Sequence, residues 1–196
     1  MKRIIASIST IIALALPAFA FASTWTIDPD HSNIGFKVKH LMVSNVNGSF
    51  DKHTGIVDIN DKDITKSKVE VTIDTASINT NVQKRDDHLR SADFFDVAKY
   101  PTMTFVSKKV ANAGNNKLKV TGDLTLHGVT REVVLDVEPL SKESKDPWGN
   151  IRRGTTATTK IDRKDFGLTW NKGLETGGVL VGEEITINLE IEMIRK

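Results

Sequence analysis

Apolar and polar residues alternate with a period of two along most of this chain, which limits it to folds built from half-buried β-strands. The longest run places an apolar residue at every second position over 185–193. Similar alternation occurs at 34–38, 69–73, 118–126 and 133–137. One apolar and one polar face is the pattern of antiparallel strands, because parallel strands are usually buried on both faces. The sequence therefore predicts an all-β, antiparallel protein.

Turn-forming residues fall between the alternating runs. Glycine, asparagine, aspartate and proline are concentrated at 113–116, 127–130 and 146–150. About eight strands in one domain form either a sandwich or a closed barrel. The long strands at 117–126 and 185–193 suit a barrel, because closure removes long exposed edges. Periodicity alone leaves both architectures open. The glycines of 177–182 do not match a phosphate-binding loop and predict a bend or hairpin before the last strand.

One segment departs from the strand pattern. Residues 82–92 are charged and compatible with a short helix, and Phe94 and Phe95 follow them in an otherwise polar loop. Adjacent aromatic rings are unfavourable in water, so the loop must bury them in the core or at the wall of a cavity. Both readings stay open for the pair. We expect Arg90 and Asp93 to hold this loop in place as structural support.

The N-terminus has the pattern of an export signal. Lys2 and Arg3 precede an apolar stretch, and Ala20-Phe21-Ala22 fits the recognition pattern of signal peptidase. We predict cleavage after Ala22, with a second frame two residues earlier; the alternative is an uncleaved membrane anchor. The expected organisation is a signal peptide at 1–22 and a single barrel domain at 23–196. The expected location is the periplasm.

Charge and cysteine content narrow the partners. The chain has 27 basic and 25 acidic residues and no cysteine. Cleavage after Ala22 would remove Lys2, Arg3 and no acid, which leaves basic and acidic residues equal in number. Overall charge therefore gives no support for a nucleic-acid partner. Without cysteine, neither a disulfide nor a lipoprotein anchor is available, and about 170 residues bury enough surface to fold without one.

The sequence carries no catalytic or metal-binding signature. There is no G-x-S-x-G motif, and the five histidines show none of the spacings H-x-x-x-H, H-x-E or HExxH. The densest cluster, Asp86-Asp87-His88, is typical of a solvated or capping helix rather than of a metal site. We predict no catalytic residues, no metal and no cofactor.

Several motifs spread over the chain resemble one family. They are DPDHSNIGF at 28–36, KHL at 39–41, GSF at 48–50, HLRSADFF at 88–95, KYP at 99–101, TGDLTLHGVT at 121–130 and DRKDFG at 162–167. These blocks are similar to those of the YceI-like family of exported, polyisoprenoid-binding-type proteins. The resemblance implies a lipocalin-like, eight-stranded antiparallel barrel whose apolar interior holds a long hydrocarbon chain. It implies no catalytic constellation.

The resulting hypothesis is a periplasmic carrier of a long-chain amphiphile, such as a polyisoprenoid, a quinone or a fatty-acid-like lipid. The partner would be a hydrophobic small molecule, with transient membrane contact allowed and the oligomeric state left open. Candidate contact residues are inward-facing or aromatic. They are Phe36, Val38, Phe94, Phe95, Met103, Phe105, Leu124, Leu126, Phe166, Leu168 and Trp170. Methionine suits such a wall because its side chain adapts to irregular shapes.

Two alternatives remain at this stage. An enzyme acting inside the barrel would need several ionisable side chains converging on the interior. A stress-response protein with a filled barrel would have no continuous cavity. The shape and chemistry of the interior therefore discriminate among the three.

Overall fold

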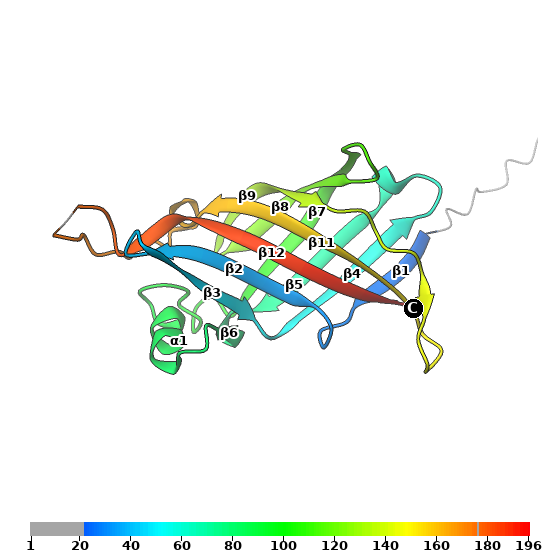
Figure 1. Ribbon diagram of the computed structural model, residues 1–196. Helices are drawn as coiled ribbons and strands as arrows, with labels where there is room; N and C mark the ends of the chain where they lie inside the picture. The colour runs from blue at the N-terminus through cyan, green and yellow to red at the C-terminus, as the bar shows by residue number, and fades with distance from the viewer. Residues whose placement is uncertain (1–21, 176) are drawn as a thin grey trace, which may run out of the picture.

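The computed structural model describes residues 22–175 and 177–196 (Figure 1). The predicted signal segment lies, except for Ala22, outside the described residues. The strands are β1 Ala22–Ile27, β2 Asn33–His40, β3 Ser44–Phe50, β4 His53–Asn60, β5 Lys68–Asp74, β6 Ile78–Asn79, β7 Thr102–Asn112, β8 Leu118–Leu126, β9 Val129–Val137, β10 Ser144–Lys145, β11 Ile151–Asp162 and β12 Val181–Arg195. The helix α1 spans Gln83–Arg90, and short 3-10 turns lie at Ile64–Lys66, Thr75–Ser77 and Arg163–Phe166.

Eight of the strands close into an antiparallel barrel. The ring runs β12, β1, β4, β5, β7, β8, β9 and β11, and β11 pairs again with β12. The pairing of β11 with β12 is long, from Arg152 opposite Ile194 to Asp162 opposite Glu184. The pairing of β11 with β9 is short, at Ala157 and Thr158. The prediction of an all-β, eight-stranded antiparallel barrel is confirmed.

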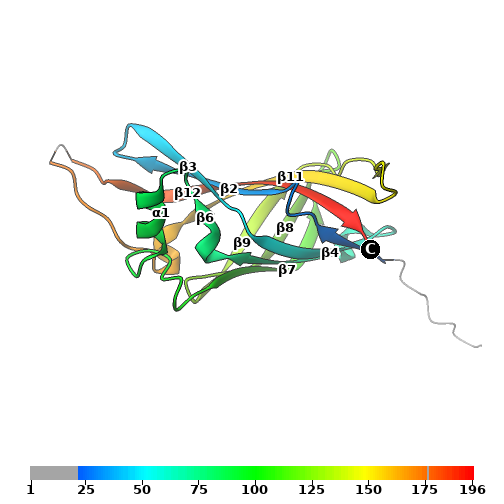
Figure 2. The ribbon, with the colours of Figure 1, turned by 90° about the horizontal axis from the view of Figure 1, so that it is seen from below.

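Strands β1 and β2 share the same edge of β12. Met193 to Arg195 pair with β1, whereas Val181 to Glu190 pair with β2. The β2–β3 hairpin therefore continues the barrel wall beyond the closed ring, and β6 adds to its far edge. Figures 1 and 2 both place this hairpin and α1 at the same end of the molecule, which we call the capped end. The C-terminus and β10 lie at the opposite end (Figure 1).

The alternating strands turn their apolar residues inward. In β8, Leu118, Val120, Leu124 and Leu126 are buried, and they belong to one large core cluster with residues of β5, β7 and β11. Gly122 takes an inward position in the same strand. A Cβ there would lie 2.5 Å from Cζ of Phe105, so the absence of a side chain leaves room for the Phe105 ring. The predicted strands at 118–126 and 185–193 are confirmed, the latter within a longer β12.

The hairpin between β8 and β9 shows how the sequence sets the register. His127 and Gly128 both have positive φ, 52° and 74°, as a two-residue primed turn requires. Glycine meets this requirement without strain, and a Cβ at Gly128 would also lie 2.5 Å from Cε1 of Tyr100. Leu126 then pairs with Val129 and the alternation continues in phase along both strands.

The predicted helix at 82–92 is confirmed as α1, which is eight residues long. None of the helices in the described part of the chain is long and apolar enough to cross a membrane.

Candidate ligand-binding cavity

The barrel encloses an apolar cavity of about 270 Å³. Nine of the eleven candidate residues line it: Phe36, Val38, Phe94, Phe95, Met103, Phe105, Leu124, Leu126 and Leu168. Phe166 and Trp170 do not. Phe166 is buried in the main core cluster, and Trp170 packs against Phe94 with ring centroids 5.0 Å apart. That the nine residues contact a ligand stays a prediction.

The cavity wall also contains residues that the candidate set omitted. They come from every strand of the ring, and those on β12 and β9 include Ile185, Ile187, Leu189, Ile191, Met193, Val133, Leu135 and Val137. The same alternation that revealed these strands could have identified them. The omission came from giving weight to aromatic residues and motif blocks, whereas a closed barrel places the inner face of every strand on the same interior.

Few polar groups face the cavity. Among its lining residues in 22–175 and 177–196, the side chains with polar atoms are Ser67, Thr155, Thr159 and Arg163. These lining residues include no acid and no histidine, so the converging ionisable cluster that a barrel enzyme would need is not found there. An interior of this kind suits hydrocarbon, which makes no hydrogen bonds and gains free energy when it leaves water.

Arg163 is a buried cation in the wall at the capped end. Its Nε donates to the carbonyl of Gly182 at 2.9 Å, its Nη2 to that of Val181 at 3.4 Å, and its Nη1 to that of Leu168. Burial lowers the pKa of the guanidinium, and the negative charges of Glu183 and Asp162 oppose that effect. The three carbonyls tie the turn after β11 to the start of β12.

The capped end is closed by α1 and the loop that carries Phe94 and Phe95. Phe95 packs edge-on against Phe50, with ring centroids 5.6 Å apart. Phe94 packs against Trp170 and against His88, whose ring centroid is 5.1 Å away. Both phenylalanine rings also line the cavity. They are therefore core residues of the cap and part of the cavity wall at once, so the two readings of the pair describe one arrangement.

Hydrogen bonds hold this cap to the barrel. Arg90 donates from Nε to the carbonyl of Ala76 and from Nη2 to that of Ile78, both at 2.7 Å. Asp93 contacts Nε2 of His88 at 2.9 Å, which fixes the ring that Phe94 packs against. The expected supporting role of Arg90 and Asp93 agrees with these contacts.

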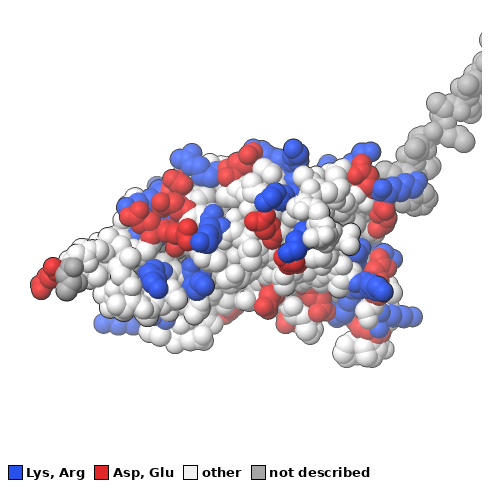
Figure 3. All heavy atoms as spheres, turned by 45° about the horizontal axis from the view of Figure 1, so that its top comes forward, with Lys and Arg blue, Asp and Glu red and all other residues white. Residues whose placement is uncertain are grey.

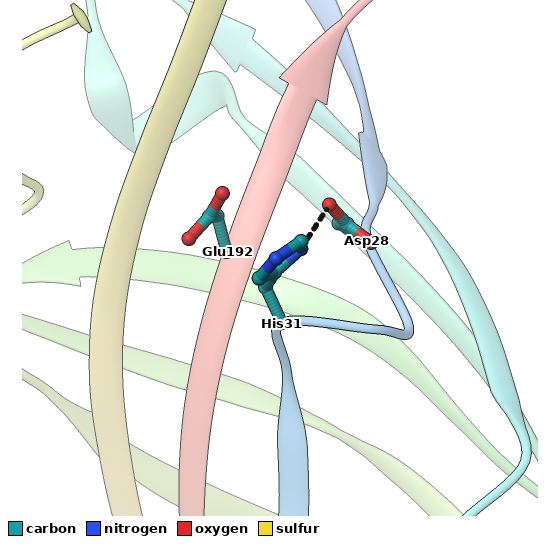
Figure 4. Close-up of side chains that lie close together, drawn as sticks. All are labelled: Asp28, His31 and Glu192. Carbon is teal, nitrogen blue, oxygen red and sulfur yellow. Dashed lines mark hydrogen bonds and ion pairs between the residues drawn. The ribbon is translucent and has the colours of Figure 1, made fainter. Parts of the chain in front are cut away.

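The opposite end holds a cluster of charged side chains from three elements. Asp28, His31 and Glu192 lie close together, and Nδ1 of His31 is 2.8 Å from Oδ2 of Asp28 (Figure 4). Nη1 of Arg152 bridges the two acids, at 2.5 Å from Asp28 and 2.6 Å from Glu192. The Arg152 guanidinium already supplies the positive charge that the two acids need, so we assign the cluster a structural role.

Burial alone would raise the pKa of Asp28 and of Asp146, which also accepts from Arg152 at 2.7 Å. Hydrogen bonds outweigh this effect and lower both pKa values instead. Arg152, His31 and the backbone of Asp30 hold the pKa of Asp28 below its ordinary value. Arg152, Asn150 and two backbone amides hold the pKa of Asp146 well below its usual range. Both carboxylates therefore stay ionised in the folded protein at neutral pH.

The contact with Asp28 raises the pKa of His31 above its ordinary 6.5, first through the hydrogen bond and then through the opposite charge. We expect an NMR titration of the imidazole to show this upward displacement and Asp28→Asn to remove most of it. A raised folded-state pKa means that the contribution of His31 to stability is complete below pH 6.5 and is lost as the pH rises through the folded value. A His31 that titrates at or below 6.5 in the wild type would show that the pair does not form in solution.

The closed antiparallel ring and its apolar cavity define a lipocalin-like barrel, the architecture in which eight strands leave an interior able to hold one small ligand. The chain belongs to the YceI-like family: the model of the YceI-like domain matches residues 25–193. The resemblance found in the motif blocks is thereby confirmed.

Known relatives agree in sequence and in shape. A UPF0312 protein of Vibrio parahaemolyticus is 43% identical over 170 residues, covering 86% of this chain and 89% of its own. The YCEI protein of Campylobacter jejuni has a solved structure with 39% identity and a TM-score of 0.68, covering 86% of this chain and 96% of that one. A domain from Saccharophagus degradans described as polyisoprenoid binding has the same fold at 19% identity, with a TM-score of 0.63 and coverage of 88% and 98%.

Proposed function

We propose that the protein is a periplasmic carrier that holds the hydrocarbon part of a long-chain amphiphile inside its barrel. The observation that carries this proposal is the interior itself: a cavity of about 270 Å³ whose wall contains apolar side chains from all eight strands of the ring. Each buried CH₂ contributes roughly 0.8 kcal/mol. A prenyl or acyl chain long enough to run along the barrel would therefore offset the free-energy cost of association.

Two further observations support the ligand class and the location. The Saccharophagus degradans domain, which shares the fold, is named for polyisoprenoid binding. The N-terminal sequence has the composition of an export signal, which would bring the barrel to the periplasm. A filled barrel would leave no such cavity, and the cavity-lining residues offer no acid–base pair for catalysis.

Organic extraction of the full chain, purified from the periplasm of an expressing bacterium, followed by mass spectrometry, tests the proposal. We expect one class of long-chain lipid at close to one molecule per chain. A protein that is empty on purification and also fails to take up added polyprenyl lipids, quinones and fatty acids would contradict it. Cell fractionation of the same culture tests the location independently.

A further inference from the structure

The turn between β2 and β3 exposes three consecutive apolar side chains. Leu41, Met42 and Val43 are 39%, 53% and 80% exposed. Leu41 and Met42 have positive φ, 53° and 62°, in the region that favours glycine, asparagine and aspartate. Hairpin turns normally use those residues because they are both polar and conformationally suited. Here the turn bears both an unfavourable exposure and an unfavourable backbone conformation, which points to a contact made by the side chains.

The turn is held in place by the neighbouring segment 178–180 of the same chain. The amide of Leu41 donates to the carbonyl of Leu180 at 2.8 Å, and Cγ of Met42 lies against the backbone of Gly178. His40 pairs with Val181, which lines the cavity together with Val38. The apolar turn is thus fixed to the capped end, beside the strands that form the end of the cavity wall.

Basic residues flank the turn without acidic partners. Lys37 and Lys39 precede it on the outer face of β2, and Lys172 lies in the segment that bonds to Leu180. All three are exposed, and within the described residues none of them forms an ion pair. The wall lysines Lys117, Lys119 and Lys160, by contrast, are each paired with an acid.

Figure 3 shows where charged side chains lie on one face of the molecule. The narrow end of the molecule is mostly free of charged side chains apart from acidic atoms at its extreme, and mixed charges cover the barrel wall behind it. The exposed apolar turn, Leu41 to Val43, with unpaired lysines beside it is the chemistry that inserts into the headgroup region of an anionic bilayer.

We propose that the apolar turn, Leu41 to Val43, with Lys37, Lys39 and Lys172, docks the capped end on the surface of an anionic lipid bilayer. Apolar side chains would enter the headgroup region while the lysines contact lipid phosphates. Docking would bring the cap formed by α1 and Phe94 to the membrane, where a lipid could enter or leave. This purpose rests on the proposed carrier function, whereas the docking itself does not.

Cosedimentation with vesicles tests the proposal. The full mature chain should bind vesicles of phosphatidylglycerol and phosphatidylethanolamine more tightly than vesicles of phosphatidylcholine. The double variant Met42→Ser, Val43→Ser should bind the anionic vesicles about tenfold or more weakly, because the inserted apolar surface is lost. The double variant Lys39→Ala, Lys172→Ala should lose about tenfold on anionic vesicles and little on neutral ones.

Three control variants make the test specific. Val106→Ser and Lys109→Ala change two exposed residues on the barrel wall, in β7, and should leave vesicle binding unchanged; Lys109 forms no ion pair with any residue that the structure describes. Trp148→Ser removes an 81%-exposed indole at the opposite end. Equal binding by the Met42, Val43 variant and the wild type would overturn the proposal, and so would a loss seen only with Trp148→Ser.

Two further measurements separate this proposal from its rivals. If light scattering shows a dimer that the Met42, Val43 variant converts to monomers, and no vesicle binding occurs, the turn is an interface between copies and the docking proposal is wrong. The lipid extracted from each variant should equal that from the wild type. If the protein binds vesicles but never contains lipid, the carrier proposal is refuted and the docking proposal stands.

Discussion

A tryptophan at position 157 is expected to empty the barrel of lipid while the protein stays folded. Ala157 is a buried residue near the middle of β11 that lines the cavity between Leu189 and Val137. Its short side chain leaves the interior space beside it unfilled. An indole at that position would extend into the space that the hydrocarbon chain is proposed to occupy.

The stability of Ala157→Trp should change little, because its new side chain enters an existing cavity rather than a packed core. Overpacking costs typically about 1–3 kcal/mol, and the added apolar burial opposes that cost. The lipid recovered by extraction should fall about tenfold or more, since an indole and a long chain cannot share the same volume. Extraction, together with a urea denaturation curve, measures both effects on one preparation.

Thr158→Trp is the matched control. Thr158 is the next residue of β11, is exposed and faces away from the cavity. The same large residue on the outer face should leave lipid content at the wild-type level. If Ala157→Trp folds and still yields as much lipid as Thr158→Trp, the ligand does not lie in the barrel interior and the carrier proposal fails.

The sequence predicted the strands because side-chain direction in a strand follows directly from backbone geometry, which alternates every residue. It predicted part of the cavity wall for the same reason: Met103, Phe105, Leu124 and Leu126 are inward positions of two clear strands. Phe166 is buried in the core cluster, as its inward assignment predicted, but it lies in the 3-10 turn Arg163–Phe166 and does not line the cavity.

Contacts between residues that are distant in the sequence could not be predicted from strand alternation. Ring closure depends on β11 pairing with β9 and β12, which local alternation does not specify. The cluster at the uncapped end joins Asp28 to Arg152, which are 124 positions apart. Each of these residues has an ordinary local environment in the sequence, and the pairing of β12 with both β1 and β11 brings them together.

That cluster gives the second large expected effect: Arg152→Met should lower the melting temperature by roughly 10 °C. The side chains of Arg152, Asp28 and Asp146 are only 18%, 8% and 7% exposed. Removing the guanidinium leaves two carboxylates out of water without the cation that compensates them. An unpaired buried charge destabilises a fold far more than the loss of a surface ion pair.

Lys160→Met is the control, because Lys160 lies on the same strand and its pair with Glu184 is more than half exposed on both sides. Its melting temperature should stay within about 2 °C of the wild type. If Arg152→Met lowers the melting temperature no more than Lys160→Met does, the cluster is an ordinary surface network.

The pH dependence of Arg152→Met distinguishes unpaired charge from lost packing. In the wild type the pKa values of Asp28 and Asp146 lie below 3.8, so their contribution is present above pH 3.8 and is lost only as the pH falls through the lower folded values. Without Arg152, burial should raise both pKa values. Lowering the pH should then stabilise the variant by protonating the carboxylates. The stability difference between wild type and variant should therefore narrow between pH 7 and pH 3.

Adding Asp28→Asn and Asp146→Asn to Arg152→Met should recover part of the lost stability at pH 7. A packing defect would respond neither to this change nor to acid.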